Sequence, residues 1–226
     1  HWWYPASTTK VAVLSYVFGA ATQHATTTGG YHEEEISRWS THLDRMIRES
    51  SNESTSTLAN HYGRKLIRAF AKDWLGIGGV ETGWLGVAGN PPDRVTARGM
   101  ARLMAYLYDD ARALNVISLP AKKKMRVLLQ ARKGSLEQEL HEGRILRHFL
   151  NQSGLPDPYA EGSLLRVGSK NGWTHESGSG NVSCFTRYRG DEVAKRWCVA
   201  VYRQGNSAYF NRIGDFYRDL YRYFAG

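Results

Sequence analysis

The sequence predicts an α+β fold, in which a mostly helical lobe is followed by an antiparallel β-sheet flanked by helices. Up to about residue 150, apolar residues recur mainly at the three- and four-residue spacing of amphipathic helices. Beyond residue 160, short runs rich in β-branched and aromatic residues alternate with turn residues. We therefore expect one domain over 1–226, with the helical lobe at roughly 7–150 and the sheet and closing helix at roughly 160–226.

Five helical segments make up the predicted helical lobe. Pro5 stops any earlier helix, Ser7 or Thr8 can cap, and the residues that follow are mostly apolar, which predicts a buried helix over 7–19. The other segments are expected over 33–50, 54–72, 96–114 with Thr96 as cap, and 119–150 with interruptions near Gly134 and Gly143. Loops are expected over 20–31 and 76–93, which are rich in Thr, Gly and Pro.

The last third of the chain predicts a meander of strands and a closing helix. The strands are expected over 164–167, 181–186 and 197–202. An amphipathic helix is expected over 213–224, with one apolar stripe that packs into the core. The stripe consists of Ile213, Phe216, Tyr217, Leu220, Tyr221 and Phe224.

The two cysteines, Cys184 and Cys198, flank a predicted turn around residues 189–192. An antiparallel register centred on residue 191 would place them opposite each other. They would then form either a cross-strand disulfide, which favours an oxidising compartment, or a pair of buried thiols. Two cysteines are too few to define a disulfide scaffold or a metal site.

The net charge of +9, from 30 Lys and Arg against 21 Asp and Glu, is partly concentrated in one segment. This segment predicts a solvated helix face, or a contact with an anionic partner such as a cell-wall polymer. Neither zinc-finger spacing nor an RNP-type strand accompanies it, so we expect no nucleic-acid partner. Its basic residues are Lys122, Lys123, Lys124, Arg126, Arg132 and Lys133.

The sequence also predicts a monomer without a membrane span, cofactor or metal. No apolar run approaches the length of about 18 residues that a membrane span requires. The chain begins at His1 without a Met or a signal-peptide pattern, as expected of a processed form or of a sequence that lacks its natural start. Four histidines, which lack the spacing of metal ligands, are expected on the surface or in the core: His61, His141, His148 and His175.

The first chemical motif is Ser7-Thr8-Thr9-Lys10, at the start of the first predicted helix. Positions i and i+3 share a helix face, so Lys10 is expected beside Ser7. A serine hydroxyl needs a neighbour to take its proton, and a partly buried lysine near other cations can do so. The helix N-terminus would also favour a developing oxyanion.

Two further motifs lie later in the chain. Ser50-Ser51-Asn52 separates two predicted helices and can direct a hydroxyl and an amide into a cleft. Lys170-Asn171-Gly172-Trp173 follows the first predicted strand, and a glycine beside a cation lets a substrate backbone approach closely. Taken singly, each motif also fits a cap or a turn.

In this order, the three motifs resemble the signatures of the penicillin-recognising serine enzymes, which include class A β-lactamases and D-alanyl-D-alanine peptidases. These signatures are S-x-x-K at a helix start, S-x-N on a loop and K-[ST]-G on the strand that lines the cleft. The resemblance extends over nearly the whole chain, including the segments Tyr4–Lys10, Met46–Asn52 and Arg94–Leu103.

The sequence departs from that pattern at several positions. Asn171 replaces the usual Ser or Thr, and Ser51 stands where class A enzymes usually carry Asp. Glu81 is the candidate for the glutamate that activates the deacylating water, but Leu85 stands where Asn is expected. The segment that follows Lys170 has no Arg to help bind a carboxylate, and almost nothing precedes Ser7, where the family has strands and a helix.

The resemblance implies a serine acyl-enzyme hydrolase, periplasmic or secreted, that acts on an amide or β-lactam carbonyl. Its substrate would be a small molecule or peptide that carries a carboxylate. Without a working glutamate, the protein would resemble a peptidase that β-lactams acylate irreversibly. If it has no catalytic activity, it would be a binding protein on the same fold. The resemblance implies that Ser7 is the nucleophile, Lys10 its base, Ser50 a proton relay and Glu81 the base for deacylation. Asn52 would contact the amide of the acyl side chain, and Lys170 and Asn171 would bind the substrate carboxylate. Gly172 would let the substrate backbone approach closely, and the backbone N–H group of Trp173 would help to bind the oxyanion.

Overall fold

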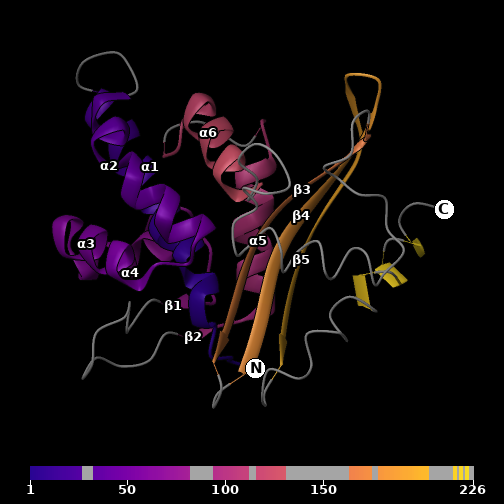
Figure 1. Ribbon diagram of the computed structural model, residues 1–226, viewed down its shortest axis with the longest axis horizontal. Helices are drawn as coiled ribbons and strands as arrows, with labels where there is room; N and C mark the ends of the chain where they lie inside the picture. The colour runs from indigo at the N-terminus through magenta and orange to yellow at the C-terminus, as the bar shows by residue number, and fades with distance from the viewer. Residues whose placement is uncertain are drawn as a thin grey trace.

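The computed structural model is an α+β structure, as predicted, with helices packed against an antiparallel three-stranded sheet (Figure 1). Among the described helices, none combines the length and the apolar character that a bilayer span requires. The structure describes residues 1–26, 33–81, 94–111, 116–130, 163–174 and 178–203, together with 216, 217, 219, 220, 222 and 223.

The first helix begins three residues later than predicted. Ser7 lies in the 3-10 turn η1 (Ala6–Thr9), and helix α1 (Lys10–Thr26) follows it directly. The predicted loop over 20–31 is wrong for residues 20–26, because α1 continues through them. Thr22 donates its hydroxyl to the carbonyl of Phe18, which satisfies a buried polar group inside the helix. α1 is buried from Val11 to Phe18 and forms the centre of the helical lobe.

Among the helices that pack against α1 are α2 (Glu33–Arg48), α3 (Asn52–Tyr62) and α4 (Arg64–Asp73). The prediction of one helix over 54–72 is wrong, because Gly63 divides it. Gly63 has a φ of 92°, a left-handed conformation in which the helical hydrogen-bond pattern cannot continue.

The remaining helices are α5 (Ala97–Tyr108) and α6 (Leu119–Leu129). Thr96 caps α5 as predicted, since its hydroxyl accepts from the amide of Gly99 at 3.0 Å. Two short strands, β1 (Val80–Glu81) and β2 (Arg94–Val95), form an antiparallel pair. The predictions for 82–93 and for 131–150, including Arg132 and Lys133, lie outside the described residues.

The main sheet contains β3 (Leu165–Thr174), β4 (Gly178–Arg189) and β5 (Glu192–Arg203), in that order. Each strand is longer than predicted, because the backbone ladder continues through flanking glycines, serines and charged residues. α5 and α6 pack on one face of the sheet. On this face lie Gly168, Lys170 and Gly172 of β3, because alternate residues of a strand point the same way.

The opposite face of the sheet contacts the described part of the closing helix. Tyr217 is buried there and packs edge-on against Phe185. The prediction that the whole apolar stripe packs into the core is wrong, because Phe216 is 42% exposed. Ile213, Tyr221 and Phe224 lie outside the described residues.

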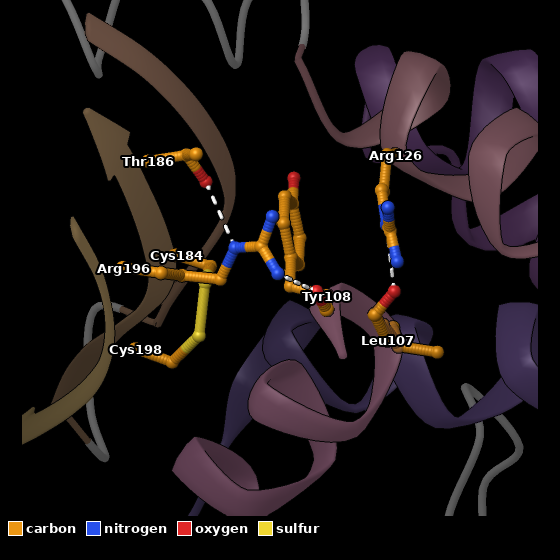
Figure 2. The surroundings of a disulfide bond; sticks show 7 residues. All are labelled: Leu107, Tyr108, Arg126, Cys184, Thr186, Arg196 and Cys198. Atoms are coloured by element: carbon orange, nitrogen blue, oxygen red, sulfur yellow. Dashed lines mark hydrogen bonds between the residues drawn. A yellow bond between two sulfur atoms is a disulfide. The ribbon is translucent and has the colours of Figure 1, made fainter. Parts of the chain in front are cut away.

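Cys184 and Cys198 are opposite each other in the β4–β5 ladder and form a disulfide, with the sulfur atoms 2.07 Å apart (Figure 2). The disulfide alternative of the sequence analysis is therefore the one that the structure contains.

Two arginines contact the C-terminal end of α5, one from the sheet beside this disulfide and one from α6 (Figure 2). Arg196 of β5 donates to the carbonyl of Tyr108, and Arg126 of α6 donates to the carbonyl of Leu107 at 2.7 Å. Cations at a helix C-terminus are favourable because the last carbonyls lack partners and the helix dipole is negative there. Burial raises the pKa of Tyr108, whose side chain lies against Gly168.

Replacing both cysteines in Cys184→Ala/Cys198→Ala should lower the free energy of unfolding by about 3 kcal/mol, because the cross-link closes a loop of roughly 15 residues. Urea unfolding followed by circular dichroism measures the change. Wild-type protein under reducing conditions is the control and should unfold at nearly the same urea concentration as the double variant. Equal midpoints for oxidised wild type and double variant would contradict the prediction.

Candidate active site

Ser7 lies in a turn that a side chain of the sheet holds in place. Thr8, its neighbour, donates its hydroxyl to the carbonyl of Pro5 at 2.8 Å, and the hydroxyl of Tyr202 in β5 lies 2.9 Å from Thr8 Oγ1. Burial raises the pKa of Tyr202, so its hydroxyl keeps the proton that it donates to Thr8. The Tyr202 ring covers Gly180, where a β-carbon would lie 2.3 Å from the ring. The turn that carries Ser7 is thereby fixed to β5.

Lys10 is the first residue of α1, and its ammonium group reaches back to Ser7. Lys10 Nζ lies 3.1 Å from Ser7 Oγ, as the three-residue spacing predicts. It also lies 2.5 Å from the carbonyl oxygen of Ser50, 3.3 Å from Ser50 Oγ and 2.8 Å from Asn52 Oδ1. The lysine is only 3% exposed, so these oxygens replace water around a buried amine.

Ser50 lies between α2 and α3 in a backbone conformation that is unusual for serine, with a φ of 58°. The next residue, Ser51, caps α3 by accepting from the amide of Ser54 at 3.1 Å. This tight connection directs both oxygens of Ser50 toward Lys10. Asn52 follows in the first turn of α3, where it contacts Lys10 and is exposed to solvent.

Lys170 approaches the same serine from the sheet. Its Nζ lies 3.0 Å from Ser50 Oγ and 2.9 Å from the carbonyl oxygen of Asn171, and the residue is fully buried. Ser50 Oγ therefore lies within hydrogen-bonding distance of two lysines from different lobes. Ser7, Lys10, Ser50, Asn52 and Lys170, predicted from three distant stretches of the chain, form one connected cluster.

Gly172 brings the backbone of β3 against the turn that carries Ser7. A β-carbon at Gly172 would lie 2.6 Å from the backbone nitrogen of Ser7 and 2.6 Å from the carbonyl oxygen of Pro5. Only glycine permits this approach. Trp173 is the next residue of β3 after this close approach.

Asn171 lies on the other face of β3 from Lys170. Its Oδ1 accepts from Asn181 Nδ2 of β4 at 2.5 Å, and the residue is 1% exposed. The predicted carboxylate contact stays a prediction.

Glu81 is described only through its backbone, which pairs with Arg94 in the β1–β2 ribbon. Next to Arg94, Val95 exchanges two backbone hydrogen bonds with Trp3, at 2.7 and 3.0 Å. The ribbon therefore lies beside the segment that leads into Ser7. The role predicted for Glu81 stays a prediction.

The described residues contain no group of three or more His, Cys, Asp or Glu side chains that could hold a metal ion. His61 packs against Trp39 with ring centroids 4.6 Å apart, on the side of α3 that faces α2. His141, His148 and His175 lie outside the described residues.

Sequence reasoning missed three side chains that support the site: Tyr202, Asn181 and Tyr217. Tyr202 was included in a predicted strand, but the pattern does not show which glycine it covers. The sequence pattern places Asn181 in a predicted strand and Tyr217 in an apolar stripe. An Asn within a run of strand-forming residues is itself a signal of a buried polar contact.

No family model matches the chain, and no curated protein matches it. The fold, in contrast, closely matches solved structures. A class A β-lactamase from Mycobacterium abscessus superposes with a TM-score of 0.68 at 13% identity, over 100% of this chain and 86% of that chain. The chain has the class A β-lactamase fold.

Further β-lactamase structures agree with this assignment. A mutant of the class A β-lactamase reconstructed for the last common ancestor of Gram-negative bacteria has a TM-score of 0.67 at 16% identity, over 98% of this chain and 86% of that chain. A mutant of the chromosome-encoded β-lactamase of Vibrio parahaemolyticus has a TM-score of 0.70 at 12% identity, with coverage of 98% and 86%. At these identities the superpositions show the fold alone, and the chemistry must be argued from this chain's own residues.

Replacing Gly172 by Ala should slow acylation of Ser7 on the order of 100-fold, because the added methyl group displaces β3 from the Ser7 amide. Labelling by a fluorophosphonate probe, followed by mass spectrometry, measures the rate. Gly78→Ala is the matched control, because Gly78 has open space around its α-carbon, and its labelling rate should be unchanged. Equal rates in both variants would contradict the close approach.

Proposed function

We propose that this protein is a serine acyl-enzyme hydrolase that acts on an amide or β-lactam carbonyl. The observation that carries the proposal is the contact of 3.1 Å between Lys10 Nζ and Ser7 Oγ, inside a cluster that also contains Ser50 and Lys170. The class A β-lactamase fold supports it, since β-lactamase structures cover nearly the whole chain.

Acylation begins when the hydroxyl of Ser7 attacks the substrate carbonyl and Lys10, as a neutral amine, accepts its proton. Repulsion between Lys10 and Lys170, which both lie within 3.3 Å of Ser50 Oγ, favours loss of a proton from one of them. As the carbon–nitrogen bond breaks, Lys10 passes a proton through Ser50 to the leaving nitrogen. The new bond joins Ser7 Oγ to the acyl carbon.

The negative charge that develops on the carbonyl oxygen requires donors that are already in place. The backbone N–H groups of Ser7 and Trp173 take this role in our proposal, because Gly172 brings β3 against the Ser7 turn. Loss of one such donor costs about 3 kcal/mol of transition-state stabilisation. Asn52, which is exposed beside Lys10, contacts the amide of the acyl side chain.

The substrate is a small molecule or peptide with a carboxylate. Lys170 supplies positive charge at the cleft, and the net charge of +9 favours the approach of anions over the whole molecule. The disulfide between Cys184 and Cys198 supports action in an oxidising compartment, such as the periplasm or the exterior of the cell.

Release of the acyl group requires a base that activates water. We assign this role to Glu81, whose backbone belongs to the ribbon that pairs with the Trp3 segment, close to Ser7 in the chain. With this base the enzyme hydrolyses β-lactams, and without it a β-lactam adduct on Ser7 persists, as in a peptidase.

Incubation with benzylpenicillin should give a covalent adduct on Ser7, detected by intact-protein mass spectrometry and located by peptide mapping. Ser7→Ala should give no adduct. Lys10→Met should slow adduct formation by roughly 10²–10⁴-fold, because the proton of Ser7 then has no acceptor. If neither penicillin nor a fluorophosphonate labels Ser7 in the wild type, the protein binds ligands on this fold without catalysis and the proposal is wrong.

Replacing Glu81 by Gln should prolong the life of the penicillin adduct by roughly 10²–10⁴-fold and leave its rate of formation unchanged. Stopped incubations followed by mass spectrometry measure both rates. Glu192→Gln, at the exposed first residue of β5, is the control and should behave as wild type. Equal adduct lifetimes in wild type and Glu81→Gln would exclude Glu81 and favour the peptidase-like alternative.

A further inference from the structure

A group of buried polar side chains joins β3, β4 and the closing helix. It lies on the face of the sheet opposite to the face on which Lys170 contacts Ser50. We refer to it as the Asn181 network. Each of its members is at most 2% exposed. The network consists of Ser169 and Asn171 of β3, Asn181 and Ser183 of β4, and Tyr217.

Asn181 is at the centre of the network and uses all of its side-chain hydrogen-bonding capacity. Its Nδ2 donates to Ser169 Oγ at 2.9 Å and to Asn171 Oδ1 at 2.5 Å. Its Oδ1 accepts from Ser183 Oγ at 2.6 Å and from the hydroxyl of Tyr217. Burial raises the pKa of Tyr217, so this hydroxyl remains a donor. The orientation of the Asn181 amide is therefore determined from both ends.

The same amide holds both chain neighbours of Lys170. Ser169 and Asn171 precede and follow Lys170 in β3, and both accept from Asn181. The carbonyl of Asn171 also accepts from Lys170 Nζ at 2.9 Å. A shift of Asn181 would move the backbone on both sides of Lys170. Buried polar groups seldom add stability over apolar residues of the same shape, so a role in orientation accounts for their presence here.

We propose that Asn181 is a positioning residue that holds Lys170 in the orientation that accepts the carboxylate of the substrate. Asn181 acts through Ser169 and Asn171, the two chain neighbours of Lys170, and does not touch the substrate. The inference rests on the proposed function and adds to it a determinant of selectivity for anionic substrates.

The test compares two probes of Ser7: benzylpenicillin, which carries a carboxylate, and a neutral fluorophosphonate, which does not. Asn181→Leu should slow acylation by penicillin roughly 10–100-fold, as expected for the loss of a residue that orients a binding group. Labelling by the fluorophosphonate should stay within about twofold of wild type, a change below the usual worth of one hydrogen bond.

Tyr217→Phe is the milder variant. It removes one donor to Asn181 and keeps the ring that packs on Phe185, so penicillin acylation should slow about 2–10-fold with unchanged fluorophosphonate labelling. If Asn181→Leu does not fold, as judged by circular dichroism, this variant decides the question. Asn60→Leu, an exposed site on α3, is the control and should leave both rates as in wild type.

Each outcome has one meaning. An equal loss with both probes shows that the network serves only stability and overturns the inference. Unchanged rates with both probes overturn it as well. If neither probe labels Ser7 in the wild type, the proposed function is overturned, and the inference with it. A loss of acylation rate in Asn181→Leu with penicillin alone supports both.

Discussion

The hydroxyl of Ser50 is the point at which three parts of the chain meet, and the geometry of the site depends on it. Lys10 reaches it from α1 at 3.3 Å and Lys170 from β3 at 3.0 Å, so one oxygen joins the helical lobe to the sheet. Both lysines are almost fully buried, and a buried amine is costly unless its N–H groups find acceptors. The strained backbone of Ser50, with a φ of 58°, supplies two acceptors at once.

Ser7, the proposed nucleophile, is positioned by the sheet as much as by the turn that carries it. Tyr202 fixes the residue after Ser7, and the bare α-carbon of Gly172 lets β3 lie against the Ser7 amide. The sheet in turn is fixed to the helices through Arg196, which caps α5 beside the disulfide (Figure 2). A displacement of β5 would therefore reach Ser7 through ordinary packing and hydrogen bonds.

The sequence predicted the fold class because hydrophobic periodicity is a local property. The contact between Ser7 and Lys10 also follows from local spacing, since they are three residues apart. Ser50 and Lys170 are distant in the chain, and only the family order of the three motifs predicted that they lie beside Lys10. The sequence did not predict the break at Gly63, since a helical pattern on both sides conceals a left-handed residue. It also missed Asn181 and Tyr217, because strand register decides which distant polar groups meet, and register depends on the whole sheet.

The β4–β5 hairpin extends away from the Ser7 turn and ends at Gly190 (Figure 1). The disulfide between Cys184 and Cys198 joins the two strands of the hairpin between that tip and the end that lies near the Ser7 turn. Were the peptide chain severed at the tip, the two strands would stay covalently joined, and β3 would keep the neighbour that aligns Lys170. The tip is consequently a suitable place for an inserted loop or for new chain ends, because the disulfide separates the exposed turn from Ser7.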